Sequence, residues 1–159
     1  EELNVSMENI NTMVLGGHGD TMVPLINHTS ISGIPLSYFI ENGLIPKKKL
    51  DEIILRTRNG GGEIVSLMKN SSAFFAPAAS GVEIAESFLK NQKKLLPCST
   101  YINGEYGCDD IFLGVPVIIG NNGVEKILKI NFNKTEAENF KKSINSVEEL
   151  ITKCKKLLV

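Results

Sequence analysis

The chain has 159 residues, which is enough for one ordinary domain with a single core. Its 17 Lys and Arg residues nearly balance its 18 Asp and Glu residues, so the charge gives no reason to expect nucleic acid or an anionic membrane surface as a partner. Nor does any apolar run approach the roughly 20 residues that a membrane-spanning helix needs.

The first half of the chain predicts two strands and then a helix. Residues 11–17 form an apolar, β-branched run that ends in glycines, and a second strand is expected over residues 25–33. Residues 44–70 have helical spacing, with Pro46 suited to the first turn. Three consecutive glycines inside this helix cost about 0.8–1 kcal/mol each relative to alanine. We therefore expect one long helix that bends at residues 60–62 or that another backbone approaches closely there.

Residues 71–92 predict another helix, with Ser71 or Ser72 available as N-cap. Its many alanines indicate tight packing. From residue 95 onward the period changes to that of strands, over residues 95–102, 114–120 and 123–130. The turn signal Asn-Asn-Gly at residues 121–123 predicts a hairpin, and residues 103–110 are expected to form a loop.

The C-terminal segment predicts the clearest helix of the chain. Thr135 and Glu138 fit a capping box. Apolar residues then recur at spacings of three and four, namely at Phe140, Ile144, Val147, Ile151, Cys154 and Leu158. Because strands and helices are segregated along the chain, the predicted class is α+β, with long helices packed on an antiparallel sheet.

His18 is the first candidate for chemistry, because it follows the first predicted strand and stands between Gly17 and Gly19. An imidazole can take up or release a proton near neutral pH, and the two glycines leave room for a ligand beside the ring. A histidine that merely occupies a glycine-rich turn is an equally good interpretation of the pattern by itself.

Other kinds of site find little support. Met22 and Val65 stand where a third glycine would complete a GxGxxG nucleotide fingerprint, and no Walker A motif occurs. His28 is the only other histidine and is distant in sequence from the acidic stretch at Glu105, Asp109 and Asp110, so no metal site is predicted and a solvated acidic loop is favoured.

The cysteines are equally uninformative as candidates for catalysis. Cys98, Cys108 and Cys154 are odd in number and form no CxxC pair, which predicts neither a disulfide framework nor a thiolate zinc site and favours a reducing, cytoplasmic compartment. Nothing around Cys98 or Cys108 suggests a nucleophile.

The segment LGGHGDTMVPL at residues 15–25 resembles the active-site histidine segment of the lactate/malate dehydrogenase family. The resemblance continues in order through GIPL, TRNGGGEIVSLMKNSSAFFAPAAS, ESFLK, LPCSTYINGEYG and GVPVIIG, over nearly the whole chain. It corresponds to the family's C-terminal, substrate-binding domain. Gly17, where lactate dehydrogenases usually carry a glutamate, and NSSAFFAPA at residues 70–78 are most similar to bacterial NAD-dependent malate dehydrogenases of the lactate-dehydrogenase-like type.

The resemblance implies a role for three residues. His18 matches the general acid/base that exchanges a proton with the hydroxyl or keto oxygen during the interconversion of (S)-malate and oxaloacetate, a reaction of the tricarboxylic acid cycle. Ser72 falls where the family lines the substrate pocket, and Ala76 is near the position that approaches the nicotinamide of NAD. The alternative interpretation is an N-cap for Ser72 and a helix-packing residue for Ala76.

The resemblance also predicts what lies outside this chain. Residues 1–159 would be the C-terminal catalytic domain of a homo-oligomer, a dimer or tetramer. The NAD-binding Rossmann domain, the aspartate that pairs with the histidine and the arginines that grip the substrate would precede Glu1, which is not a methionine. Arg56 and Arg58, the only arginines, do not match these and are expected on a helix surface.

Two alternatives and one consequence follow. The substrate could be lactate or another 2-hydroxy acid, or the chain could be a non-catalytic oligomerisation module that uses its long helices for subunit contacts. If the missing segments supply NAD and carboxylate binding, the isolated chain is expected to be inactive.

Overall fold

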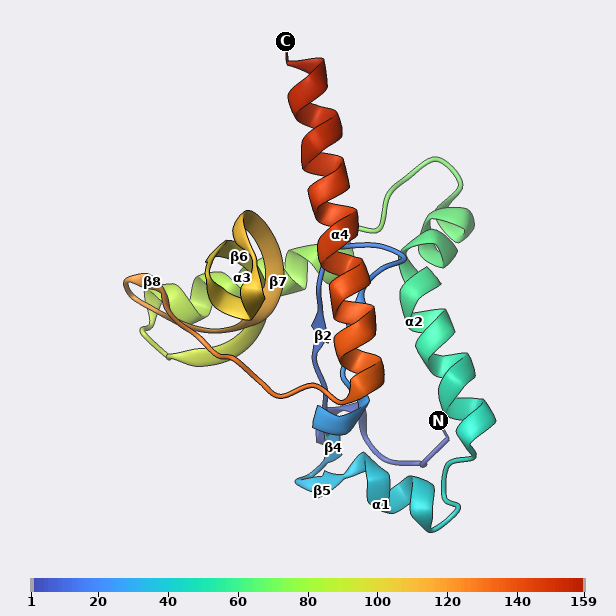
Figure 1. Ribbon diagram of the computed structural model, residues 1–159. Coiled ribbons are helices and arrows are strands. Elements are labelled where there is room, and N and C mark those ends of the chain that lie inside the picture. Colours follow the sequence, from blue (N-terminus) through green and yellow to red (C-terminus); the bar gives the residue numbers. More distant parts are fainter. Residues whose placement is uncertain (1, 159) are drawn as a thin grey trace.

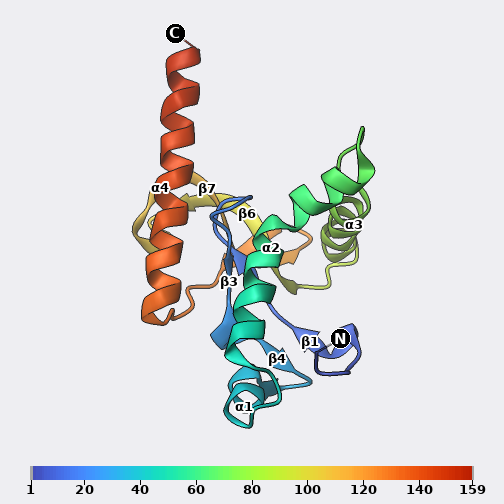
Figure 2. The same cartoon turned by 90° about the vertical axis from the view of Figure 1, so that its right-hand side faces the viewer.

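The computed structural model describes residues 2–158, in which helices surround three small antiparallel sheets (Figures 1 and 2). The α-helices are α1 (Leu36–Glu41), α2 (Lys47–Met68), α3 (Phe75–Leu89) and α4 (Lys134–Leu157). The strands are β1 (Ile10–Asn11), β2 (Val14–Leu15), β3 (Val23–Pro24), β4 (Ser30–Ile31), β5 (Ile34–Pro35), β6 (Lys94–Asn103), β7 (Asp109–Gly120) and β8 (Gly123–Ile127). Short 3-10 turns cover Met7–Asn9, Ile26–His28 and Glu105–Gly107. The predicted class, α+β with helices packed on antiparallel sheet, is confirmed.

The largest sheet is the meander β6-β7-β8. β6 and β7 pair from Lys94 opposite Ile119 to Asn103 opposite Asp109. The three predicted strands are therefore confirmed in place, although β7 begins earlier than expected and takes Asp109 and Asp110 out of the predicted loop. The hairpin between β7 and β8 is also confirmed, and Gly123 adopts there the positive φ of +82° that favours glycine.

The strands predicted near the N-terminus are wrong in extent. The segment 11–17 divides into β1, which pairs with β4, and β2, which pairs with β3. The segment 25–33 is interrupted by the 3-10 turn at residues 26–28 and keeps only β4 as a strand. The first segment changes its pairing partner within a few residues, and pairing partners leave no trace in local hydrophobic periodicity.

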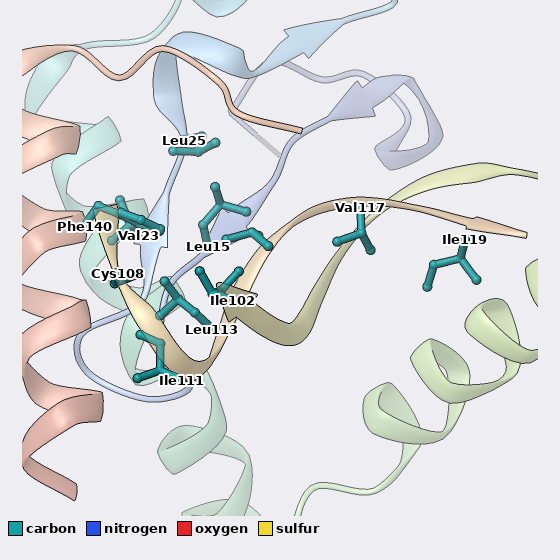
Figure 3. Packing of buried hydrophobic residues seen from close by; sticks show 11 residues of the cluster. Leu15, Val23, Leu25, Ile102, Cys108, Ile111, Leu113, Val117, Ile119 and Phe140 are labelled. Carbon is teal, nitrogen blue, oxygen red and sulfur yellow. The ribbon is translucent and has the colours of Figure 1, made fainter. Parts of the chain in front are cut away.

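The main core lies where β2 and β3 meet the β6-β7 hairpin and α4 (Figure 3). Its buried members are Leu15, Val23, Leu25, Ile102, Cys108, Ile111, Leu113, Val115, Val117, Ile119 and Phe140. A second, smaller cluster of Ile31, Leu36, Ile45 and Leu50 joins β4 and α1 to the start of α2. The short ribbon β2-β3 is thus anchored in the main core.

The capping box of α4 lies at Asn133 and Glu136, so the predicted pair Thr135 and Glu138 is wrong. Asn133 Oδ1 accepts a hydrogen bond from the Glu136 N–H at 2.7 Å, and Glu136 Oε2 accepts one from the Asn133 N–H at 3.1 Å. Of the predicted apolar stripe, Phe140 is buried, Ile144, Val147 and Ile151 pack against the core, and Cys154 and Leu158 are exposed. The stripe therefore faces the core only in the first part of the helix, and its last turns extend away from the sheets (Figure 1).

α2 and α3 contribute little to either core. The predicted single long helix is confirmed as α2, and Figure 2 shows that it changes direction along its length. Yet Leu50 is its only buried residue, and its apolar residues Ile53, Ile64, Leu67 and Met68 are exposed. α3 buries only Ser87, so the tight packing predicted for its alanines does not occur within residues 2–158. The apolar faces of both helices are open.

The glycines of α2 lead to a first prediction. Among residues 2–158, no neighbouring element comes within 4 Å of a Cβ atom built on Gly60, Gly61 or Gly62. In the 159-residue chain, Gly61→Ala is therefore expected to raise the free energy of unfolding by about 0.8–1 kcal/mol, the difference in helix propensity.

Urea unfolding monitored by circular dichroism measures this change. Gly43→Ala is the matched control, because Gly43 is equally unobstructed but has a φ of +68°, and it should lose stability. A loss of stability in Gly61→Ala would show that the glycine serves the bend of α2 or a close approach of another backbone.

Candidate functional site

His18 lies in a loop that begins directly after β2 and returns in β3. The residues at its two ends, Leu15 and Val23, are each only 1% exposed and belong to the main core. Gly16 and Gly19 have φ angles of +90° and +115°, which an L side chain rarely adopts and which turn the chain between the two strands. The core thus fixes the ends of the loop and leaves its tip outside.

The imidazole of His18 is exposed at this tip. Among residues 2–158, no hydrogen bond or ion pair joins this imidazole to another residue. An exposed imidazole held between glycines is open to a ligand from several directions. The prediction that the first apolar run delivers His18 at its end agrees with the structure, although the strand itself is shorter than expected.

The entry of the loop is bonded to β7 and to α4. Gly16 and Gly114 exchange backbone hydrogen bonds, at 2.8 Å from Gly16 N to Gly114 O and at 3.0 Å in the other direction. The next residue, Gly17, donates its N–H to Ser143 Oγ of α4 at 2.8 Å. These two contacts hold the backbone up to the residue before His18.

The exit of the loop is bonded to α2. The guanidinium of Arg58 donates from Nε to the carbonyl oxygen of Met22 at 3.1 Å, and Arg58 is half-buried. The expectation that both arginines lie on a helix surface is therefore wrong for Arg58. It is correct for Arg56, which is exposed and forms a two-pronged pair with Glu63 at 2.8 and 2.9 Å.

Sequence reasoning missed Ser143, Gly114 and Arg58 as parts of this site. Ser143 is separated from its partner Gly17 by 126 positions, and a single serine within an amphipathic helix has no local signature. The apolar stripe of α4 could have indicated that this face points inward, but not which loop it contacts.

Ser72 lies in the connection between α2 and α3, which Figure 1 shows as an open arch in green, and Ala76 lies in the first turn of α3. Both are exposed. Ser71 and Ser72 do not cap α3, because the N-cap position is Phe74 and it makes no side-chain cap bond. The alternative interpretations as N-cap and packing residue are therefore wrong within the described part of the chain, where no hydrogen bond joins either residue to His18.

The thiols in the second half do not resemble nucleophiles. Burial raises the pKa of Cys98, and the nearby carboxylate of Glu83 adds to the shift. Burial likewise raises the pKa of Cys108, with Glu148 contributing. A reactive cysteine needs the opposite shift, because the thiolate is the attacking species.

Acidic residues of the stretch predicted as a loop form hydrogen bonds with residues nearby. Glu105 accepts a hydrogen bond from the Asn103 N–H at 2.9 Å, which helps to hold its pKa below the usual value. Asp110 accepts one from the hydroxyl of Tyr101 at 3.1 Å. His28 lies in the 3-10 turn at residues 26–28. In the range 2–158 these residues do not form a group of three or more ligands for a metal ion.

Two surface hollows lie elsewhere on the molecule. One, of about 390 Å³, follows α2 from Ile53 to Ile64, and the other, of about 370 Å³, lies between Tyr106 and α4. His18 lines neither of them. Any chemistry performed by His18 therefore takes place at its loop and not in these hollows.

No helix within residues 2–158 has the length and apolar character to cross a bilayer.

The chain is similar to proteins of known structure over most of its length. Residues 1–158 match the sequence model of the lactate/malate dehydrogenase alpha/beta C-terminal domain. The chain is similar to malate dehydrogenase from Cryptosporidium parvum, at 45% identity and a TM-score of 0.95, over 98% of this chain and 49% of that one. It is equally similar in fold to lactate dehydrogenase from Eimeria maxima solved with NADH and oxamate, at 40% identity and a TM-score of 0.95, with 98% and 49% covered.

A third solved structure is malate dehydrogenase from Picrophilus torridus in its apo form. Its identity to this chain is 49% and its TM-score 0.85, over 93% of this chain and 46% of that one. The chain therefore spans about half the length of the solved structures that it matches. Both malate and lactate dehydrogenases are among them.

Proposed function

Because this chain belongs to the lactate/malate dehydrogenase family, as its alpha/beta C-terminal domain, we propose that it is the substrate-binding and catalytic domain of an NAD-dependent malate dehydrogenase with His18 as general acid/base. The observation that supports this most directly is the placement of His18. It is exposed at the tip of a loop whose two ends are buried in the core and whose backbone is bonded to β7, α4 and α2.

The proposed chemistry of His18 is a proton transfer. In the oxidation of malate the imidazole accepts the hydroxyl proton while the C2–H leaves as hydride, and in the reduction of oxaloacetate it donates a proton to the keto oxygen. Without this transfer the reaction would produce a protonated ketone, and a positioned acid or base contributes on the order of 10²–10⁴ in rate. NAD, when bound, supplies the hydride acceptor.

The residues present fit only one end of NAD. Ala76 offers a small, exposed side chain at the first turn of α3, which suits contact with a flat nicotinamide ring. By contrast, neither glycine-rich segment completes a dinucleotide fingerprint, and Gly60, Gly61 and Gly62 lie inside α2 and not in a phosphate-binding turn. We therefore propose that most of the cofactor is held by an N-terminal part of the protein outside this chain, and that Ser72 contributes to the substrate pocket.

Malate as substrate is supported by Gly17. A Cβ atom at this position would stand 2.8 Å from Val147 Cγ2, so a glutamate, the residue that lactate dehydrogenases usually carry there, would have to displace the Val147 side chain of α4. The segment at residues 70–78 adds the second resemblance to malate dehydrogenases. Lactate remains the alternative that the fold of the Eimeria enzyme supports.

Steady-state kinetics of the full-length protein test this proposal. With NAD⁺, kcat/KM is expected to be higher for (S)-malate than for (S)-lactate by at least about 10²-fold, because a site built to bind a polar group of its substrate rejects an analogue that lacks this group. The 159-residue chain alone, assayed in parallel, should show no malate-dependent NADH formation. A higher kcat/KM for lactate would show that lactate, and not malate, is the substrate. If the full-length protein turns over neither acid, the proposal is rejected.

The open apolar faces of α2 and α3 indicate further contacts. Leu67 is 76% exposed, Phe75 79% and Leu89 78%. Large exposed apolar patches usually mark interaction surfaces. We propose that the remainder of the protein and a second copy cover these faces in a homo-oligomer. The free thiols Cys98, Cys108 and Cys154 support a reducing, cytoplasmic compartment.

A further inference from the structure

The hydroxyl of Ser143 lies at the base of the loop that carries His18 and contacts it on both sides of the histidine. It accepts the N–H of Gly17 at 2.8 Å and points as a donor toward Thr21 Oγ1 at 3.4 Å. Ser143 is 0% exposed. One buried hydroxyl of α4 therefore bonds to the residue before His18 and lies close to a residue three positions after it.

α4 is pressed closely against this part of the loop. A Cβ atom on Gly17 would stand 2.8 Å from Val147 Cγ2, and one on Gly16 would stand 3.0 Å from Ser143 Cβ and nearer still to its Oγ. A side chain at either position would have to displace Ser143 or Val147 of α4. The absence of side chains that makes this approach possible also gives the loop wide conformational freedom, so its direction has to be set from outside.

We propose that Ser143 is a positioning residue for proton transfer at His18, an inference that rests on the proposed function. By accepting the Gly17 N–H, the hydroxyl fixes the Gly16–Gly17 peptide, one residue before His18, and so limits the directions that the imidazole can take. A misplacement of a reacting group by about 1 Å can cost on the order of 10²-fold in rate. An alanine at this position would leave a buried N–H without its partner and release the loop from α4.

If Ser143 served packing alone, its replacement would lower stability without a specific effect on kcat. The chain offers a matched control for this case. Ser87 of α3 is also 0% exposed. Its hydroxyl likewise accepts a backbone N–H, that of Lys94 at 3.2 Å, and donates to the carbonyl oxygen of Ile119 at 2.6 Å. It ties α3 to the ends of β6 and β7 and not to the histidine loop. Ser87→Ala and Ser143→Ala thus remove the same type of group from the same type of environment.

The test compares Ser143→Ala, Ser143→Cys, Ser87→Ala and His18→Asn in the full-length protein with malate and NAD⁺. For Ser143→Ala, kcat is expected to fall about 10- to 100-fold, while NADH affinity, measured by fluorescence titration, changes less than about twofold. The primary isotope effect of malate deuterated at C2 should rise, because the hydride step becomes more strongly rate-limiting. The sulfur of Ser143→Cys is a weak hydrogen-bond acceptor of similar size, so the kcat of this variant should lie between that of the wild type and that of Ser143→Ala. Ser87→Ala should lower the unfolding temperature but keep kcat.

The outcomes separate this proposal from the proposed function. If Ser143→Ala keeps the wild-type kcat, or if Ser87→Ala lowers kcat to the same extent, the positioning role is overturned while a loss of activity in His18→Asn still supports catalysis by His18. If Ser143→Ala does not fold, Ser143→Cys decides, and wild-type kcat in that variant overturns the role. Full activity in His18→Asn would overturn the proposed function together with this inference.

Discussion

Replacing His18 with asparagine in the full-length protein is expected to lower kcat for malate oxidation by about 10²–10⁴-fold, the contribution of a positioned acid or base. Asparagine is polar and of similar size, but it cannot take up the hydroxyl proton. NADH binding should persist, because the proposed cofactor contacts lie elsewhere. Because His18 is exposed, its replacement removes no buried contact and should leave the unfolding temperature unchanged.

His28→Asn is the matched control for this experiment. His28 is the only other histidine in the chain, and it is also exposed, in the 3-10 turn at residues 26–28. Its replacement should leave kcat unchanged. Stopped-flow and steady-state assays of both variants measure the difference. An unchanged turnover rate in His18→Asn would favour the alternative, a non-catalytic oligomerisation module.

The second large effect is expected for Gly16→Ala. Gly16 has a φ of +90°, and a Cβ atom there would stand 3.0 Å from Ser143 Cβ. The left-handed backbone contributes roughly 1–2 kcal/mol of strain for an L residue, and overpacking against α4 adds about 1–3 kcal/mol. We expect the free energy of unfolding of the 159-residue chain to fall by about 2–5 kcal/mol, and the midpoint temperature by about 5–20 °C. In the full-length protein the same variant should lose activity, because α4 can no longer approach the loop.

Gly33→Ala separates strain from steric overlap. Gly33 has a φ of +85°, close to that of Gly16, yet nothing within residues 2–158 lies within 4 Å of a Cβ atom built on it. The loss of unfolding free energy in Gly33→Ala should therefore be limited to the backbone strain of roughly 1–2 kcal/mol. Differential scanning calorimetry of the two variants measures the contrast. Equal losses would show that the close approach of α4 to Gly16 contributes nothing to stability.

The long helices and the hairpin strands could be predicted because their signals are local. The spacing of apolar residues in α4, the change to alternation at residue 95 and the turn at residues 121–123 each act over a few positions. His18 was also identifiable, but its proposed role came from the resemblance of the surrounding segment and not from periodicity. The N-cap of α4 was predicted wrongly because Asn133 and Thr135 both suit this position. The local sequence does not choose between them.

By itself, the sequence determined which segments form helices and hairpin strands, which family the chain resembles and which histidine to examine, because each of these depends on residues close together in the chain. Tertiary structure alone decided that the N-terminal strands divide between two sheets, that Arg58 bonds to Met22 and that Ser143 accepts the N–H of Gly17. Such contacts join residues that only folding brings together, so neither partner carries a local pattern that identifies the other. The position of the histidine loop therefore depends on how closely α4, α2 and β7 approach it.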